Sequence, residues 1–331
     1  MPAMAETFSF GIYPLSVAGT PFGLATGPAD DVDRIRAALA DLGEGTAGPV
    51  PRVYLIHTPE WEDRIVATAD RYRDAGLLGD LVIGCGDWTQ QSDGFVPERW
   101  RDVIRMIIDR YHADLRSVQI TNEPNLSFME GSKPYTMQAL VEGVLTAKQE
   151  LRKRDLSVPV GFGSVPDGPA AVPGFWRQVA EAGTAFHQAV DFVAHNFYVD
   201  VFDDAPLELP QIRTAVEQTL QELRHNLRTA GLADDLPIRI GENGWPTGKN
   251  PLTGVERPYQ RQAEVLEAVI RTVDGLRARL HVTHYSLFGL RDADSAQDDL
   301  FHQYGILRDD YTPKPAYAVY KGLIRELGGV A

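Results

Sequence analysis

Short apolar runs alternate along this chain with longer runs in which apolar residues recur at helical spacing. Within the short runs apolar and polar residues do not alternate strictly, which is typical of parallel strands buried on both faces. The first long run carries Ile35, Leu39 and Leu42 and follows an acidic turn at 30–33, which suits the positive end of a helix dipole. The pattern predicts eight strands, at residues 8–13, 52–56, 81–85, 117–121, 158–162, 192–196, 238–241 and 282–287.

Each predicted strand is followed by a predicted helix, and such a chain most economically forms a closed (β/α)8 barrel, an α/β fold. A doubly wound open sheet is the alternative, because it is assembled from the same strand–helix units. A length of 331 residues suits one barrel with insertions, and no linker interrupts it, so a single domain over residues 1–331 is expected. After the first helix, others are predicted at about residues 59–75, 97–111, 134–154, 172–182, 211–230, 258–276 and 313–327.

The charge balance is strongly acidic, with 32 Lys and Arg against 46 Asp and Glu and a net charge of −14. Such a chain lacks the basic surface that grips nucleic acids or anionic membranes, so neither is expected as a partner. No apolar run approaches the about 20 residues that a membrane helix needs. Hydrophobic residues at 44% exclude a largely disordered chain. The single cysteine, Cys85, excludes an intrachain disulfide and a cysteine-rich zinc site.

The first residues, MPAMAETFSFGIYP, contain neither the basic nor the apolar region of a signal peptide. We therefore expect a cytoplasmic location for the chain as written; a leader removed ahead of this sequence would overturn that expectation. Arginine greatly outnumbers lysine, which is typical of bacterial proteins from GC-rich genomes. A cytoplasmic bacterial protein would not use the glycosylation sequon at Asn125.

Two glutamates stand where predicted strands four and seven end. Strand four continues as Asn122-Glu123-Pro124-Asn125, and strand seven continues as Gly241-Glu242-Asn243-Gly244-Trp245-Pro246. Barrel active sites lie at the carboxyl ends of the strands, and strands four and seven are nearly opposite, so the two glutamates are expected to face one another. Glycosidic bond cleavage needs such a pair, one as proton donor and one as anion. Either glutamate considered alone could equally be an acidic residue of a surface loop. The presence of both at these strand ends favours catalysis.

With these two segments the sequence resembles glycoside hydrolase clan A, the retaining (β/α)8 glycosidases. The segment after strand seven is similar to that of the β-1,3-glucanase and β-xylosidase-like branches. The resemblance implies that Glu123 is the general acid/base and Glu242 the nucleophile, while Asn122 holds the sugar 2-hydroxyl. Carboxyl groups about 5–5.5 Å apart imply retention through a covalent glycosyl-enzyme. Their mutual repulsion keeps Glu123 protonated while Glu242 is ionised.

Supporting residues follow from the same resemblance. Arg52 is similar to the arginine that hydrogen-bonds the nucleophile, although its early place in its strand fits a barrel-bottom ion pair equally well. Strand six ends His195-Asn196-Phe197-Tyr198, and clan members place a tyrosine against the nucleophile two residues after a histidine or asparagine. Counting from His195 gives Phe197, and counting from Asn196 gives Tyr198, which we favour. His195 is either a core histidine or a contact to substrate or to the acid/base, and Asn196 is assigned to substrate binding.

Aromatic rings are expected as platforms for flat sugar faces. Trp88 follows strand three, Trp245 follows the candidate nucleophile, and Tyr285 lies on strand eight. Clan members often supply a tryptophan from strand eight, so Tyr285 or Phe288 must take its place here. The remaining tryptophans lie on helical runs and are predicted to pack between helices and barrel: Trp61, Trp100 and Trp176.

Several other signals carry little weight. Residues 43–48 match G-x-G-x-x-G but follow a helix and precede a strand, the reverse of the order that a dinucleotide needs. The acidic segment 291–299 lacks the glycine and terminal glutamate of a calcium loop. The histidines show no zinc spacing, and no Gly-x-Ser-x-Gly elbow is present. We expect neither a metal nor a cofactor.

The sequence thus predicts a retaining β-glycosidase that hydrolyses a β-linked oligosaccharide or glycoside, with a carbohydrate substrate as its partner. Transglycosylation uses the same residues when a second sugar outcompetes water. The alternatives are a sugar-binding barrel without catalysis, which has no need of both glutamates, and a metal-dependent barrel hydrolase, which chelators would inhibit.

Overall fold

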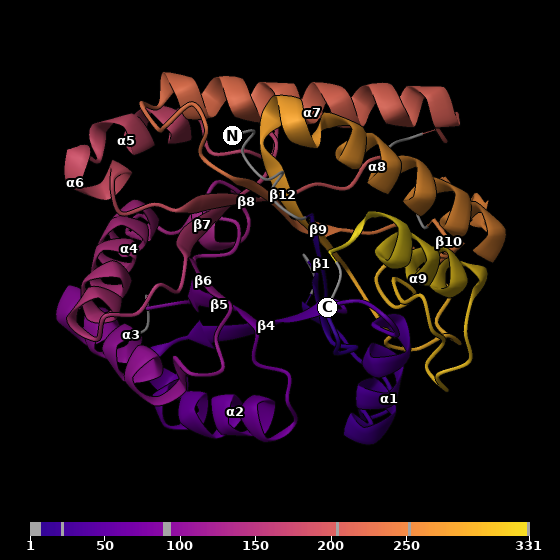
Figure 1. The fold of residues 1–331 in the computed structure, drawn as a ribbon, viewed down its shortest axis with the longest axis horizontal. Helices are drawn as coiled ribbons and strands as arrows, with labels where there is room; N and C mark the ends of the chain where they lie inside the picture. Colours follow the sequence, from indigo (N-terminus) through magenta and orange to yellow (C-terminus); the bar gives the residue numbers. More distant parts are fainter. Residues whose placement is uncertain (1–7, 21–22, 89–93, 203–204, 251–252, 330–331) are drawn as a thin grey trace. The chain divides into compact units, whose positions relative to one another are not determined.

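The computed structural model describes residues 8–20, 23–88, 94–202, 205–250 and 253–329. Eight parallel strands close a barrel in the order β1-β12-β9-β8-β7-β6-β5-β4, and a helix follows each barrel strand along the chain (Figure 1). The predicted (β/α)8 barrel is confirmed, and the open doubly wound sheet is excluded. Residues 1–7, on which the expectation about a signal peptide partly depends, lie outside the described residues.

The barrel strands match the apolar runs of the sequence, with ends that differ from prediction by at most two residues. They are β1 (Ser9–Ile12), β4 (Val50–His57), β5 (Asp80–Cys85), β6 (Ser117–Ile120), β7 (Val160–Ser164), β8 (Phe192–Asn196), β9 (Ile238–Asn243) and β12 (Val282–Leu287). Two antiparallel pairs were not predicted, because strands of two or three residues leave no periodic pattern. These pairs are β2 (Ala18–Thr20) with β3 (Gly23–Ala25), and β10 (Gly248–Lys249) with β11 (Glu256–Arg257).

The helices also follow the predicted amphipathic runs. The run 172–182 becomes helical only at Phe175, because Gly174 has a left-handed φ of 75° that a helix interior does not tolerate. Within the described ranges no helix is both long and apolar enough to cross a membrane. The helices are α1 (Val32–Leu42), α2 (Glu62–Asp74), α3 (Pro97–Tyr111), α4 (Thr136–Lys153), α5 (Phe175–Glu181), α6 (Thr184–His187), α7 (Leu209–Thr229), α8 (Tyr259–Leu280) and α9 (Pro315–Leu327), with short 3-10 turns at Pro59–Trp61 and Glu130–Ser132.

The chain forms two compact units. The first contains residues 1–51, 197–221 and 239–331, and the second contains residues 52–196 and 222–238. The expectation of a single domain over residues 1–331 stays a prediction.

In the second unit α3 and α4 lie side by side outside strands β5 to β7 (Figure 1). Trp100 of α3 is fully buried, and its indole N–H donates to the carbonyl of Ala139 on α4 at 2.8 Å. Gly143 lets α4 approach β6 closely, since a Cβ there would lie 2.6 Å from a methyl of Ile120. Trp100 therefore packs as predicted. Trp61 is 49% exposed, so the prediction that it packs between helix and barrel is wrong.

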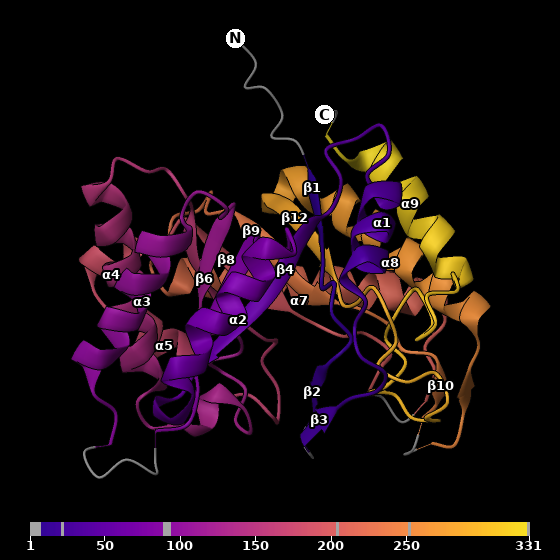
Figure 2. The same cartoon turned by 90° about the horizontal axis from the view of Figure 1, so that it is seen from below.

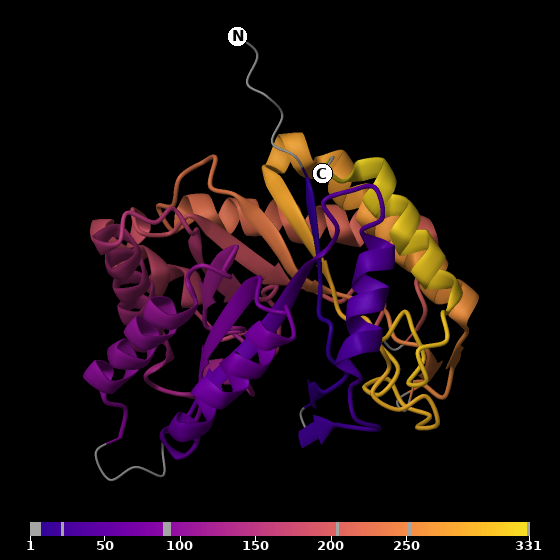
Figure 3. The same ribbon diagram turned by 60° about the horizontal axis from the view of Figure 1, so that its bottom comes forward.

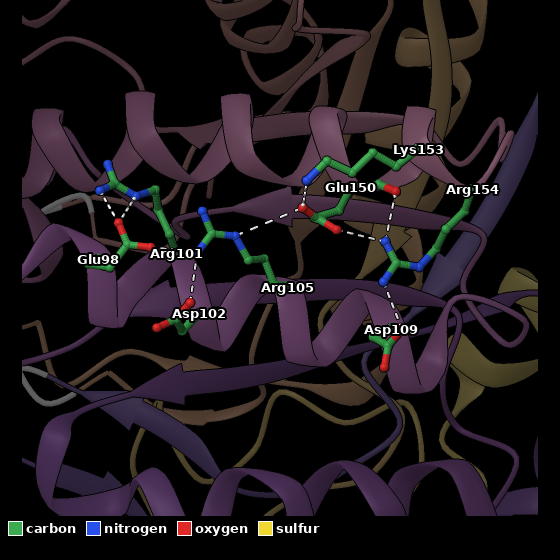
Figure 4. A network of polar contacts seen from close by, with 8 residues as sticks. All are labelled: Glu98, Arg101, Asp102, Arg105, Asp109, Glu150, Lys153 and Arg154. Carbon is green, nitrogen blue, oxygen red and sulfur yellow. Dashed lines mark hydrogen bonds and ion pairs between the residues drawn. The ribbon is translucent and has the colours of Figure 1, made fainter.

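A chain of ion pairs joins α3 to α4 on their outer faces (Figure 4). At its centre the buried carboxylate of Glu150 accepts from Lys153 and Arg154, each at 2.7 Å. Arg154 then reaches Asp109 of α3, also at 2.7 Å. The side chains around Glu150 are partly exposed, and ion pairs at a surface stabilise only weakly one by one, so the apolar contact beneath them holds the two helices together. The other members of the chain are Glu98, Arg101, Asp102 and Arg105.

In the first unit α1, α9 and α8 form one layer (Figures 2 and 3). Lys321 of α9 pairs with Asp41 of α1 at 2.6 Å, and on the other side Arg271 of α8 pairs with Glu326 of α9 at 2.8 Å. The β2–β3 hairpin packs against the loop that follows β12, through a small apolar cluster that includes Ala293.

Candidate active site

Glu123 leaves strand β6 at its carboxyl end. Thr121 continues the sheet, because its N–H donates to the carbonyl of Ile83 at 2.9 Å, but its φ of 62° turns the chain away from the strand direction. The Asn196 side-chain amide, at the end of β8, donates to the Glu123 carboxylate at 3.1 Å and to the Asn122 side-chain oxygen at 3.2 Å. Asn196 is 1% exposed, so one buried amide orients both residues of the Asn-Glu pair.

Arg52 lies below this strand end and is buried. Its guanidinium donates to the side-chain oxygen of Gln119 at 2.8 Å and to the Tyr54 hydroxyl at 2.9 Å. Gln119 in turn donates to the carbonyl of Thr121 at 2.8 Å. In this unit Arg52 therefore supports the backbone that carries Glu123. Its predicted hydrogen bond to Glu242 stays a prediction.

His195 is a buried residue of β8, paired in register with Ser164 of β7. Its Nδ1 lies 2.9 Å from the Ser164 hydroxyl oxygen. Burial lowers the pKa of His195 to about 3, so the imidazole is neutral at neutral pH. The residue can act there as a neutral hydrogen-bonding group, and its contact to substrate stays a prediction.

A third carboxyl group, which the sequence did not single out, lies under the Asn-Glu pair. Glu130 accepts the backbone N–H of Asn122 at 2.7 Å. Burial raises the pKa of Glu130 to about 8, and backbone hydrogen bonds from Asn122, Cys85 and Glu123 partly oppose this shift. Glu130 is therefore mostly protonated at neutral pH. It begins a short 3-10 turn between β6 and α4, where the sequence has no apolar periodicity, so no pattern in the sequence marked it.

Glu242 is the penultimate residue of β9 and is 7% exposed. The Tyr198 hydroxyl donates to its carboxylate at 2.7 Å, while the N–H of Phe197 donates to its backbone carbonyl at 3.0 Å. The tyrosine that contacts Glu242 is therefore Tyr198, two residues after Asn196, which is the alternative favoured from the sequence. The Tyr198 ring meets the rings of Tyr304 and Phe288 edge to face, with centroids 5.7 and 6.4 Å away, which fixes its orientation.

Tyr285 has no exposed surface, although the sequence assigned it to a sugar platform. Its hydroxyl donates to the side-chain oxygen of Asn243 at 2.6 Å, and the Asn243 amide donates to the carbonyl of Phe197 at 2.8 Å. Its ring packs edge to face on Phe10 of β1. A ring without accessible surface cannot stack on a sugar, so Tyr285 instead orders the backbone next to Glu242.

Trp88 and Trp245 are also buried, at 0% and 3% exposure. The Trp245 indole N–H donates to the carbonyl of Asp200 at 3.1 Å, and the Arg257 guanidinium lies 5.0 Å from its ring. Trp88 meets Phe95 edge to face. Both tryptophans pack within their own units, so the structure does not offer them as exposed platforms, in contrast to the expectation from the sequence.

Phe288, the other aromatic candidate from strand eight, is only partly buried. Tyr13 stacks on it with ring centroids 4.9 Å apart and an interplanar angle of 4°. Phe288 also contacts the ring of Tyr198, the residue that holds Glu242.

No group of three or more His, Cys, Asp or Glu side chains among the described residues is placed to hold a metal ion. In the acidic segment 291–299, the Asp292 carboxylate is buried against the Lys314 ammonium at 2.7 Å. Asn125 of the sequon is fully buried and exchanges two 2.8 Å hydrogen bonds with the backbone of Val165.

No protein-family model matches this sequence, and no curated protein does. Similar folds occur among solved structures. A GH2 β-galacturonidase from Eisenbergiella tayi bound to galacturonate shares 18% identity over 91% of this chain and 48% of its own, with a TM-score of 0.58. A β-glucuronidase from Ruminococcus gnavus in complex with D-glucuronic acid shares 16% identity over 96% of this chain and 49% of its own, with a TM-score of 0.59. A β-D-glucuronidase from Dictyoglomus thermophilum shares 16% identity over 98% of this chain and 51% of its own, with a TM-score of 0.59. The chain spans about half the length of these structures, and at this identity the likeness shows the fold.

Proposed function

We propose that this chain is a retaining β-glycosidase in which Glu242 is the nucleophile and Glu123 the general acid/base. The observation that carries the proposal is the 2.7 Å hydrogen bond from Tyr198 to Glu242, which holds a nearly buried carboxylate at the carboxyl end of a barrel strand. The amide of Asn196 supports Glu123 at a second strand end in the same way.

The first step forms the glycosyl-enzyme. A carboxylate oxygen of Glu242 attacks the anomeric carbon, and the bond from this carbon to the leaving oxygen breaks. Glu123 gives its proton to that oxygen as it departs. The Tyr198 hydroxyl keeps the Glu242 carboxylate in the rotamer that attacks.

The second step releases the sugar. Glu123, now a carboxylate, takes a proton from water while the water oxygen attacks the anomeric carbon and the bond to Glu242 breaks. Two inversions restore the β configuration. When a sugar hydroxyl takes the place of water, the same step yields a transglycosylation product.

The substrate that we propose is a β-linked glycoside or oligosaccharide. Uronic sugars belong among the first candidates, because the structures of similar fold are a β-galacturonidase and β-glucuronidases with galacturonate and D-glucuronic acid as ligands. Neutral glucosides, galactosides and xylosides complete the series to be tested.

The experiment compares wild type, Glu242→Ala and Glu123→Ala on aryl β-glycosides of these sugars, with and without azide. Glu242→Ala should lose turnover and regain it with azide, giving an α-glycosyl azide because only one inversion occurs. Glu123→Ala should retain cleavage of 2,4-dinitrophenyl glycosides and give a β-glycosyl azide. Glu256→Ala, an exposed glutamate on β11, is the matched control and should behave as wild type.

Full turnover in Glu242→Ala would disprove the nucleophile assignment. Absence of wild-type cleavage across the whole series would disprove the glycosidase proposal for these sugars and favour sugar binding without catalysis.

A further inference from the structure

Glu130 is a buried carboxylic acid that the two-step reaction does not use. Its carboxyl oxygen Oε1 is inaccessible to solvent, and a Cβ on Gly84 would lie 2.5 Å from that oxygen. The Glu130 carboxyl group and a methyl of Ile56 thus fill the space beside Gly84, near the end of β5. The other oxygen, Oε2, accepts the N–H of Asn122.

The loop that presents Glu130 is tightly closed on itself. The N–H of Leu126 donates to the carbonyl of Glu123 at 3.0 Å, and a Cβ on Gly131 would lie 2.7 Å from the carbonyl oxygens of Pro124 and Leu126. The carbonyl of Glu130 accepts the hydroxyl of Thr136, the first residue of α4. Glu130 thus ties the segment that carries Glu123 to a helix outside the barrel.

Asn122 is the only residue between the turn at Thr121 and Glu123. A small rotation of the peptide that carries its backbone N–H therefore changes the direction of the Glu123 side chain. A buried N–H that lost its acceptor would rotate or recruit water, because leaving it unpaired costs free energy. A hydrogen bond at this peptide controls the direction of Glu123 more directly than one elsewhere in the loop.

We propose that Glu130 is a positioning residue for the general acid/base: its carboxyl group, held between Gly84 and Asn122, fixes the Asn122 peptide and with it the direction of Glu123. This inference rests on the proposed function, in which Glu123 protonates the leaving oxygen. Being mostly protonated at neutral pH, Glu130 does so without adding a full negative charge next to Glu123.

The test uses leaving-group dependence, because a misdirected acid matters only where the leaving oxygen needs a proton. The probes are a 4-methylphenyl and a 2,4-dinitrophenyl β-glycoside of the best sugar found for wild type. Glu130→Ala should lower kcat/KM about ten- to hundred-fold on the first and less than about three-fold on the second, since displacing a catalytic group by about 1 Å costs on this scale.

Glu130→Gln keeps an oxygen that can accept the Asn122 N–H, so it should recover most of the loss on the 4-methylphenyl substrate. Glu142→Gln, on α4 at the surface of the same unit, controls for loss of a carboxylate and should match wild type on both substrates. The side chain of Glu130→Asp is too short to reach the N–H, so this variant should show the same difference between the two substrates as Glu130→Ala. It replaces Glu130→Ala if the alanine variant does not fold.

Equal losses on both substrates in Glu130→Ala and Glu130→Asp, or no loss in either folded variant, would overturn the positioning role while leaving the proposed function intact. If wild type cleaves neither substrate, the proposed function fails, and this inference fails with it.

Discussion

Tyr198 holds Glu242 through a single hydroxyl whose ring is fixed by aromatic neighbours, so its effect can be isolated by removing one oxygen atom. Tyr198→Phe keeps the ring contacts and deletes the hydrogen bond to the carboxylate. Hydrogen bonds to charged groups contribute about 1.5–3 kcal/mol, so kcat/KM should fall about ten- to hundred-fold with little change in thermal stability.

Tyr317→Phe is the control, because Tyr317 donates to Asp41 on the surface of the same unit, at 2.8 Å. It should retain wild-type kcat/KM. Equal kinetics for Tyr198→Phe and Tyr317→Phe would show that the Tyr198 hydroxyl has no part in the reaction.

Glu130 also predicts a pH dependence of stability. Its pKa is about 8 in the fold against an ordinary value of 4.5, so between these values the native state holds one proton more than the unfolded state. Its contribution is therefore fully present below about pH 4.5 and is lost as pH rises toward 8, by about 1.4 kcal/mol per pH unit. Glu130→Gln does not titrate, so its free energy of unfolding should increase relative to that of wild type as the pH rises across this range.

Urea unfolding of both proteins at pH 5, 6.5 and 8 measures this difference, and all other titrating groups cancel in the comparison. A difference that stays constant with pH would show that Glu130 is already ionised in the fold at pH 5.

At the level of elements, the buried Lys314–Asp292 pair joins three segments of the first unit. Lys314 precedes α9, Asp292 lies in the loop after β12, and the ammonium also donates to Thr247 in the loop after β9, at 2.9 Å. Both side chains are fully buried, and burial raises the pKa of Asp292 while the ammonium opposes that shift. The pair therefore locks the loops after β9 and β12 against the start of α9.

Lys314→Met should destabilise the protein by about 3–5 kcal/mol, because it leaves the Asp292 carboxylate buried without an opposite charge, although Ser295 and Gly305 still donate hydrogen bonds to it. The double variant with Asp292→Asn should recover much of this loss, since no buried charge remains. Urea unfolding measures both, with Lys321→Met on α9 as a surface control. A double variant no more stable than Lys314→Met would show that packing, rather than the unpaired charge, is responsible.

At the level of the whole molecule, the reaction that we propose needs only the chain's own carboxyl groups. Treatment with EDTA followed by removal of the chelator should leave turnover of the best glycoside unchanged, and added Ca²⁺, Mg²⁺ or Zn²⁺ should not raise it. Loss of turnover that one of these ions restores would instead support the metal-dependent barrel hydrolase.

The amino-acid sequence by itself determined the strands and helices, the closure expected of eight strand–helix units, and the place of Glu123 and Glu242 at strand ends. These features depend on neighbours along the chain: apolar periodicity selects strand or helix, and the residues after an apolar run stand at its end. Tyr198 could also be predicted from the sequence, because it stands two residues after Asn196.

Only the tertiary structure decided which side chains surround those glutamates. Trp88, Trp245 and Tyr285 carry the residue types of sugar platforms, yet packing from distant segments buries all three. Glu130 reaches the Asn122 N–H because a closed loop returns it there and Gly84, 46 residues earlier, leaves the space. Burial and hydrogen-bond partners are properties of segments brought together from far apart in the chain, and local periodicity does not encode how such segments meet.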